Sequence, residues 1–324
     1  MRWVIAFLGI LLLVGCRPQA EVRFVRLAHS LDVTHSVHQA MMRMGEDLEK
    51  LSEGRMRLEI YPNQQLGSER EILELLQIGT LDMTKVSVAT LENFAPKTRI
   101  LGLPYLFRNR GHAFAVLDGS IGQELLDDGL KYWLKGLGFY DAGYRSFYTM
   151  ARPVTHPDDL KGLKVRVMES VTAINMIRSM GGSPTPISWG ELYTALQQGV
   201  VDAAENNPPS FYLARHYEVC KYYALDEHTF SPDVLIAGTQ FWDTLSTEEQ
   251  SWLRQAAQES IAYQRELWAL AEAEALAAVR KAGVEVSRPD KAPFREMSQE
   301  AYALYEADTT LNRLIRQIQA TPDP

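Results

Sequence analysis

The spacing of apolar and polar residues between positions 162 and 209 predicts a strand, two helices and a second strand. Two valines alternate with larger side chains over residues 164–168, which is the period of a strand with two different faces. Apolar residues then recur at helical spacing from Ser170 until Gly181 ends the pattern. A second helical stretch follows, and residues 200–204 form another short apolar run. The order predicts a β-α-β-like unit, in which small ligands bind beyond the carboxyl ends of the strands.

The first 151 residues show the same alternation of strands and helices. Runs of strand length occur at residues 22–28, 56–61, 81–88, 136–144 and 146–151. Helical patterns separate the first three runs, and Asp32 or Thr34 is expected to cap the first helix. Strands and helices that alternate in this way favour a parallel sheet with helices on its faces.

One long helix is predicted in the last third of the chain. A capping box begins at Ser246, and no proline or glycine follows before Gly283. At about 1.5 Å per residue the helix would be roughly 50 Å long, which exceeds what one domain needs. A helix of this length can lie beside two domains.

The overall composition is that of an ordinary globular protein. The 324 residues are 46% hydrophobic and 23% charged, which is enough for two domains with separate cores. The formal net charge of −8 argues against nucleic acid as a partner.

Residues 1–15 have the pattern of a bacterial signal peptide. Arg2 precedes an apolar stretch, residues 3–14, that is shorter than a membrane span. The next residue, Cys16, completes a sequence that resembles a lipobox, so it is predicted to be the lipidated mature N-terminus that tethers the protein to a membrane. An ordinary secretory signal with a chance cysteine is the alternative. Cys220 is the only other cysteine, so no internal disulfide is expected in the mature chain.

Several side chains suited to binding an acid lie near predicted strand ends. Arg166 carries five donors in a planar fork that matches a carboxylate, and Asn206 can donate and accept at once. A surface ion pair and a turn are the alternatives for these two residues. Further pocket candidates in the first half of the chain lie near the ends of predicted strands or at the start of the following helix: His35, Glu69, Lys85 and Ser87.

Two of these candidates have competing interpretations. His35 and His38 are three residues apart, but two histidines without a third ligand make a weak metal site, so we expect no metal. Lys85 lies inside an apolar strand, where a buried amine needs a partner or a ligand. Exposure on an edge strand is the alternative for Lys85.

The motif G-L-K-V-R-V together with V-D-A-A-E-N-N resembles the signature region of the solute-binding proteins of tripartite ATP-independent periplasmic (TRAP) transporters, of the DctP type. In that family the arginine of the first motif forms the salt bridge with the substrate carboxylate, which implies this role for Arg166. The resemblance likewise implies ligand contacts for Asn206 and Arg145, and packing on the ligand for Trp189. Arg145 could instead clamp the crossover between domains. The positions that match Ser30, Glu69 and Ser87 lie in the ligand-binding region of the family.

The resemblance covers almost all of the mature chain and implies its architecture. The expected fold is α/β, a two-lobed periplasmic binding protein of type II-like topology, with a ligand cleft between the lobes and a long helix spanning both. The expected lobes are residues 22–143 plus 231–271 and residues 144–230 plus 272–324. Closure over the ligand would present it to the TRAP permease subunits in the membrane.

Several stretches resemble the subset of the family that binds hexuronates such as glucuronate and galacturonate. Among them are E-N-N-P-P-S from Glu205 and L-D-M-T-K-V-S from Leu81. Polar groups near the predicted pocket suit the hydroxyls of a sugar acid: Glu69, Lys85, Glu169 and Asn207, beside Met168. The charge on Glu169 is expected to disfavour a second carboxylate on the ligand. A C4-dicarboxylate or another organic acid is the alternative ligand.

Other functional classes remain open from the residues alone. A periplasmic lyase or isomerase could use Lys85 or a histidine as its base, but no catalytic, phosphate-binding or dinucleotide motif is present. A ligand-sensing subunit of a receptor would share the fold and the site. We therefore expect a binding protein that has no cofactor and no catalytic residues.

Overall fold

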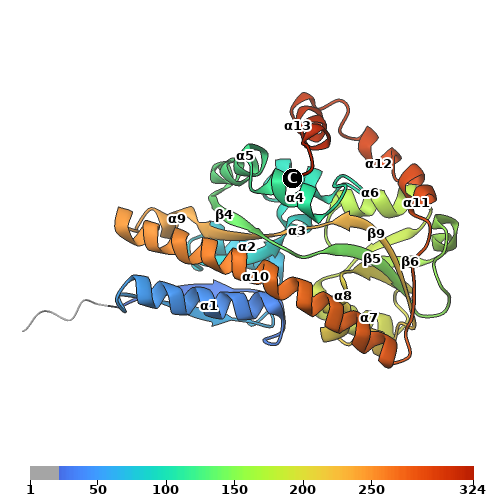
Figure 1. The fold of residues 1–324 in the computed structure, drawn as a ribbon, viewed down its shortest axis with the longest axis horizontal. Helices are drawn as coiled ribbons and strands as arrows, with labels where there is room; N and C mark the ends of the chain where they lie inside the picture. The colour runs from blue at the N-terminus through green and yellow to red at the C-terminus, as the bar shows by residue number, and fades with distance from the viewer. Residues whose placement is uncertain (1–21) are drawn as a thin grey trace, which may run out of the picture.

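Two mixed β-sheets, each covered by helices, organise residues 22–324, which are the part of the chain that the computed structural model describes (Figure 1). The predicted signal peptide and the lipidation site at Cys16 lie outside these residues. We call the part around the five-stranded sheet the first lobe and the part around the six-stranded sheet the second lobe. Within the described residues, no helix has both the length and the apolar character needed to cross a bilayer.

The sheet of the first lobe has the strand order β2-β1-β3-β10-β4. Its strands are β1 (Arg23–Ala28), β2 (Met56–Tyr61), β3 (Met83–Ser87), β4 (Leu134–Tyr140) and β10 (Asp233–Gly238). The first three are parallel, as the alternation of strands and helices predicts, and β10 returns antiparallel between β3 and β4. Apolar clusters pack on both faces of this sheet.

The helices that cover the first lobe follow the predicted pattern with one difference at a cap. They are α1 (Ser36–Leu51), α2 (Glu69–Gln77), α3 (Val88–Leu91), α4 (Arg110–Leu117), α5 (Ser120–Asp128) and α9 (Thr239–Trp242), with 3-10 turns η1 (Pro96–Gly102) and η2 (Gly129–Tyr132). The expected cap of α1, Asp32 or Thr34, is wrong, because the His35 ring accepts the hydrogen bond from the backbone N–H of Val37. Asp32 instead accepts from the N–H and hydroxyl of Thr34 in a local turn.

The sheet of the second lobe has the strand order β11-β9-β5-β8-β6-β7. Its strands are β5 (Tyr144–Thr149), β6 (Lys164–Val167), β7 (Ser183–Pro186), β8 (Ala203–Asn206), β9 (Tyr222–Phe230) and β11 (Glu285–Ser287). The helical elements around it are η3 (Pro157–Leu160), α6 (Val171–Ser179), η4 (Trp189–Glu191), α7 (Leu192–Gln197), α8 (Pro208–Leu213), η5 (His216–Glu218), α11 (Lys291–Met297) and α12 (Glu300–Ala303). The predicted β-α-β unit is present, because β6 is parallel to both β7 and β8. β8 begins at Ala203 rather than at position 200, and β7 was not predicted.

Short links join the two sheets. β4 leads into β5 through residues 141–143, and β9 leads into β10 through residues 231–232. Gly143 has a φ of +63°, and a Cβ there would lie 2.9 Å from Nε1 of Trp268. The first link therefore needs glycine both for its backbone conformation and for the close approach of an indole ring.

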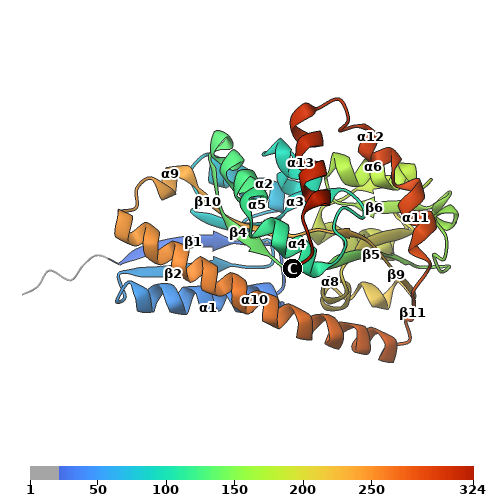
Figure 2. The same ribbon diagram turned by 45° about the horizontal axis from the view of Figure 1, so that its top comes forward.

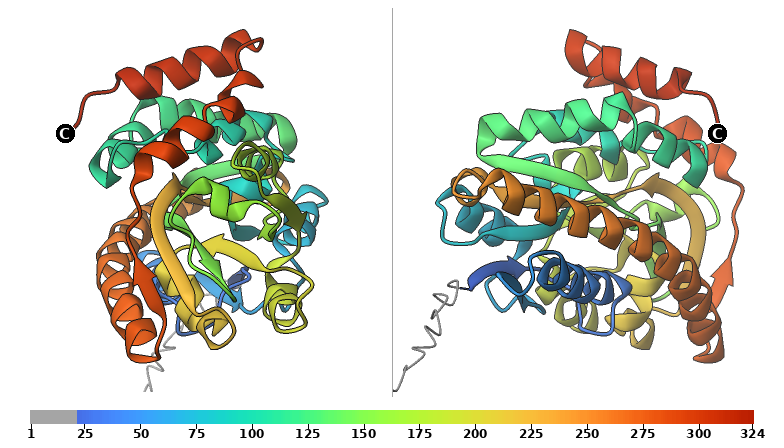
Figure 3. Two further views of the ribbon diagram at one scale, coloured as in Figure 1. Left: turned by 90° about the vertical axis from the view of Figure 1, so that its right-hand side faces the viewer. Right: turned by 60° about the vertical axis from the view of Figure 1, so that its left-hand side comes forward.

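The long helix is α10 (Thr247–Lys281), which runs past both lobes without a break (Figures 2 and 3). Its capping box at Ser246 is formed as predicted. The helix packs against α1 and β4 in the first lobe and against α8 in the second. It therefore spans the molecule from one sheet to the other.

The last helix, α13 (Thr309–Ala320), packs on the first lobe, although the chain reaches it from the second. Its apolar face joins the same core cluster as Ile100 of η1 and Leu125 of α5. The carbonyl of Ile318 contacts the buried ring of His112 at 2.9 Å, which fixes α13 on α4. This packing differs from the assignment of residues 272–324 to the second lobe, and the other lobe boundaries stay a prediction.

Candidate ligand-binding site

A cavity lies between the two sheets. The carboxyl ends of β1 and β3 contribute to it from the first lobe, and those of β6 and β8 from the second. All twelve predicted site residues line it: Ser30, His35, Glu69, Lys85, Ser87, Arg145, Arg166, Met168, Glu169, Trp189, Asn206 and Asn207.

Arg166, near the end of β6, is a buried cation that forms no salt bridge with any acidic side chain of residues 22–324. Only 1% of the residue is exposed, and its Nε donates to the carbonyl of Ile187 at 2.8 Å. Its Nη1 is buried and makes no hydrogen bond with any described residue. Burial lowers the pKa of Arg166 to about 10, so the guanidinium still carries its charge at pH 7. Because Arg166 lines the cavity, its Nη1 is the donor that an anion bound there could use.

Arg145 lines the same cavity but is already paired. Its guanidinium forms a two-pronged salt bridge with the carboxylate of Glu205, and its Nη1 donates to Oδ1 of Asn206 at 3.0 Å. The carbonyl of Glu205 accepts another bond from Arg145 at 2.8 Å. These bonds tie β5 to β8 within the sheet of the second lobe and orient Asn206, so they do not clamp the crossover between the lobes.

The salt bridge of Arg145 belongs to a larger buried charge network. His228 contacts Asp226 at 2.8 Å through Nδ1 and lies 3.5 Å from Glu205 through Nε2. Burial alone would favour the neutral imidazole, but Asp226 and Glu205 outweigh it and raise the pKa of His228 to about 9. The positive charges of Arg145 and His228 are thus balanced by the carboxylates of Glu205 and Asp226.

The wall of the cavity in the first lobe is a second charged cluster, formed by Lys85, Asp233 and Glu69. Lys85 Nζ lies 2.6 Å from Asp233 Oδ2 and 3.6 Å from Glu69 Oε1. Burial opposes the charge of Lys85, yet the two carboxylates raise its pKa above the usual value. The alternative of an exposed edge-strand lysine is wrong, because Lys85 is 2% exposed on β3, a strand with neighbours on both sides.

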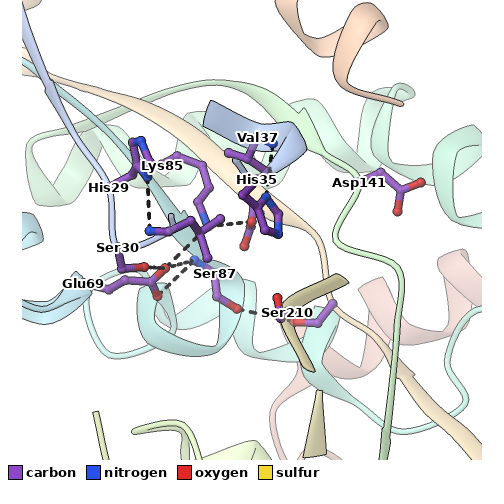
Figure 4. Close-up of polar contacts among 12 residues, drawn as sticks. His29, Ser30, His35, Val37, Glu69, Lys85, Ser87, Asp141 and Ser210 are labelled. Carbon is purple, nitrogen blue, oxygen red and sulfur yellow. Dashed lines mark hydrogen bonds and ion pairs between the residues drawn. The ribbon is translucent and has the colours of Figure 1, made fainter. Parts of the chain in front are cut away.

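Glu69 is held in place by groups from three neighbouring segments (Figure 4). The hydroxyl of Thr90 donates to its Oε2 at 2.8 Å, and the N–H of Ser87 donates to the same oxygen at 3.2 Å. The hydroxyl of Ser30 donates to Oε1 at 3.4 Å. These bonds satisfy the Glu69 carboxylate and fix its orientation at the start of α2.

His35 lies beside this cluster with a fixed tautomer (Figure 4). Because its Nδ1 accepts from the backbone N–H of Val37 at 3.2 Å, the ring proton must reside on Nε2. Nε2 is buried and has no partner among the described residues. Burial and then the charge of Lys85 lower the pKa of His35 to about 3, so the ring is neutral. His35 therefore offers one N–H donor.

The other histidine of the possible metal pair has a different partner. Nδ1 of His38 lies 3.0 Å from Nε2 of His29, and the backbone N–H of Leu31 donates to Nδ1 of His29. Within residues 22–324 no three histidine, cysteine or acidic side chains are grouped to hold a metal ion.

At the mouth of the cavity the two lobes meet. Glu169 is exposed, and its carboxylate lies 3.8 Å from Arg70 of the first lobe. Trp189 packs against apolar clusters of both lobes, with its ring 5.3 Å from that of His216. Gln64 approaches Gly190 so closely that a Cβ there would lie 2.3 Å from its Oε1. These contacts describe lobes that are closed over the cavity.

The sequence did not indicate several residues that line the cavity. They include Gln64, Arg70, Thr90, Ser210, Ser231, Asp233 and Trp268. Asp233 had a detectable signal, because an aspartate at the start of an apolar run is the kind of partner that the buried Lys85 required. Trp268 had none, since it reaches the cavity from the middle of a helix whose period marks it only as apolar.

Comparisons with known proteins agree with this architecture. The family model for bacterial extracellular solute-binding proteins, family 7 (DctP), matches residues 27–308. The protein YiiZ of Salmonella typhimurium is 37% identical over 297 residues, which cover 91% of this chain and 90% of YiiZ.

Two solved structures of TRAP periplasmic solute-binding proteins are similar along most of the chain. One, from a Bradyrhizobium species in complex with galacturonate, is 42% identical with a TM-score of 0.90, and the match covers 92% of this chain and 100% of that one. The other, from Roseobacter denitrificans with bound β-D-glucuronate, is 35% identical with a TM-score of 0.90 and the same coverage. The chain therefore belongs to family 7 of the bacterial extracellular solute-binding proteins, the DctP family, and is a periplasmic solute receptor of a TRAP transporter.

Proposed function

We propose that this receptor binds a hexuronate, such as galacturonate or glucuronate, through a salt bridge between Arg166 and the ligand carboxylate. The observation that carries the proposal is that Arg166, a buried cation lining the cavity, has an Nη1 with no hydrogen-bond partner among residues 22–324. A buried charge without a counter-ion is costly, and a ligand carboxylate would remove that cost. Similar proteins that hold galacturonate and β-D-glucuronate support the choice of ligand class.

The remaining cavity residues would recognise the hydroxyls. Asn206, oriented by Arg145, and Asn207, whose Oδ1 accepts from the N–H of Ser210 at 2.8 Å, lie on the side of the second lobe. Ser30, Ser87, Lys85 and Glu69 lie on the opposite side. Met168, Glu169 and Trp189 border the opening. Polar groups on both sides of the cavity suit a ligand with hydroxyls around a ring.

Delivery of the ligand would follow from closure of the lobes around residues 141–143 and 231–232. The closed receptor would dock on the TRAP permease subunits, and a lipid on Cys16 would keep it at the membrane surface. Loss of acyl labelling in a Cys16→Ser variant, with export intact, is the expected result. Labelling that persists in that variant would exclude Cys16 as the anchor.

The test of ligand class is a thermal-shift screen of the purified receptor with galacturonate, glucuronate, succinate and malate. A ligand at a hundred times its dissociation constant stabilises the folded state by about 2.7 kcal/mol, which is a readily measured shift. We expect shifts with the uronates and none with the C4-dicarboxylates. The uronate should be recovered unchanged by NMR after prolonged incubation, because a binding protein releases its ligand without converting it. A shift with succinate alone would refute the hexuronate assignment.

A further inference from the structure

The buried cluster of Lys85, Asp233 and Glu69 on the first-lobe side of the cavity has two carboxylates and one cation. We propose that this wall, formed by Lys85, Asp233 and Glu69, accepts a ligand hydroxyl and rejects a second carboxylate. The receptor would then select sugar acids with a single carboxylate over the corresponding diacids. The inference rests on the proposed function, because it concerns the same cavity.

The charges around the cavity are unevenly distributed between the lobes. In the second lobe, Arg145 is neutralised by Glu205, and Arg166 has no acidic partner among the described residues. In the first lobe, the buried cation Lys85 faces both Asp233 and Glu69, so these three side chains carry one excess negative charge. Arg70, the other cation that the first lobe contributes to the cavity lining, pairs with Glu74 and Glu169. The side chains of Lys85, Asp233 and Glu69 are at least nine-tenths buried, and little solvent lies between them and a ligand to screen the excess.

Hydrogen-bonding groups on this wall fit a hydroxyl better than a carboxylate. Asp233 uses Oδ2 for Lys85, while no described residue donates to its Oδ1. His35, close to the same amine, presents Nε2–H with no acceptor. A sugar hydroxyl can donate to Oδ1 of Asp233 and accept from Nε2–H of His35, so it could satisfy both groups. A carboxylate could accept from His35 but would leave Asp233 opposed by a like charge.

Glu169, which the sequence indicated as the source of this selectivity, is a poorer candidate than the buried wall. Its side chain is 43% exposed, and Arg70 lies close enough to offset its charge. Solvent and the neighbouring guanidinium would screen it from a ligand inside the cavity. The discrimination should therefore respond to changes at Asp233 and Glu69 rather than at Glu169.

The experiment compares galacturonate with galactarate, the six-carbon acid that carries a carboxylate at both ends. Dissociation constants for both are measured by calorimetry in wild type, Asp233→Asn, Glu69→Gln, Glu169→Gln and Glu259→Gln. The first two variants each remove the excess charge from a different element, so a folding defect in one leaves the other informative. Glu259 lies on the exposed face of α10 and serves as a control for charge removal alone.

For wild type we expect about a hundredfold preference for galacturonate, the size that two like charges roughly 6 Å apart produce in a protein interior. Asp233→Asn or Glu69→Gln should reduce the ratio of the two constants at least about tenfold. The proposal is overturned if wild type binds both acids equally, if neither variant changes the ratio, or if Glu169→Gln changes it instead. Absence of galacturonate binding in folded wild type would refute the proposed function, which is a separate outcome.

Discussion

Replacing Arg166 by methionine should separate its cost to the empty protein from its contribution to binding. Methionine keeps much of the length of the side chain and removes the charge. Burial lowers the pKa of Arg166 to about 10, and a displacement of that size corresponds to about 3 kcal/mol of destabilisation of the charged form in the folded protein. Loss of the bond from Nε to Ile187 offsets about 1 kcal/mol of the gain.

The empty Arg166→Met protein should therefore be at least as stable as wild type in urea denaturation. Its affinity for galacturonate should fall more than about a hundredfold, because removing one side of a buried charge pair typically costs ~3–5 kcal/mol. Calorimetry measures the affinity, and Arg178→Met is the matched control. Arg178 is an exposed arginine on α6 of the same lobe, so its variant should retain wild-type binding.

Two results would refute this reasoning. An unchanged dissociation constant in Arg166→Met would mean that the ligand carboxylate is held elsewhere. A large loss of stability in the empty variant would mean that the guanidinium has a counter-charge within the protein. Either result would contradict the proposed salt bridge between Arg166 and the ligand carboxylate.

Two further changes test other parts of the structure. Lys85→Met should destabilise the protein by about 3–5 kcal/mol in urea, because it leaves two buried carboxylates unpaired. Lys161→Met, at the exposed ion pair with Asp158, should cost under about 1 kcal/mol, and equal effects would contradict the buried cluster. His228 has a folded pKa of about 9, above its unfolded value of 6.5, so the stability that its charge contributes is full below about pH 6.5 and disappears as the pH rises through 9. In denaturation curves, His228→Gln should therefore lower the free energy of unfolding most at pH 6 and least at pH 10. A loss of stability that does not depend on pH would contradict the charged state of His228.

Much of the fold could be predicted because it depends on local patterns. The alternation of strands and helices implied the parallel start of the first sheet, and the absence of proline and glycine implied the length of α10. β7 escaped detection because two of its four residues are prolines, which are rare in strands. The cap of α1 was missed because a histidine ring performs a task that aspartate and threonine perform more often.

The cavity residues could be predicted from strand ends, but their pairing could not. Arg145 and Arg166 look alike in the sequence, yet only the first has a carboxylate beside it, contributed by Glu205 on a different strand. The apolar strand around Lys85 indicated that its amine needs a partner, but the partner is Asp233, which lies 148 positions further along the chain. Distances of this kind depend on tertiary packing, which neither spacing nor composition encodes.

The position of β10 between β3 and β4 has a consequence for how the exported chain folds. β4 pairs with no strand of its sheet except β10, and β3 has an open edge until β10 arrives. A chain that emerges with its N-terminus first will have released residues 144–230, and with them five of the six strands of the second sheet, before that edge is covered. The second lobe can therefore assemble early, while the lobe that was synthesised first waits with a strand edge exposed to aggregation.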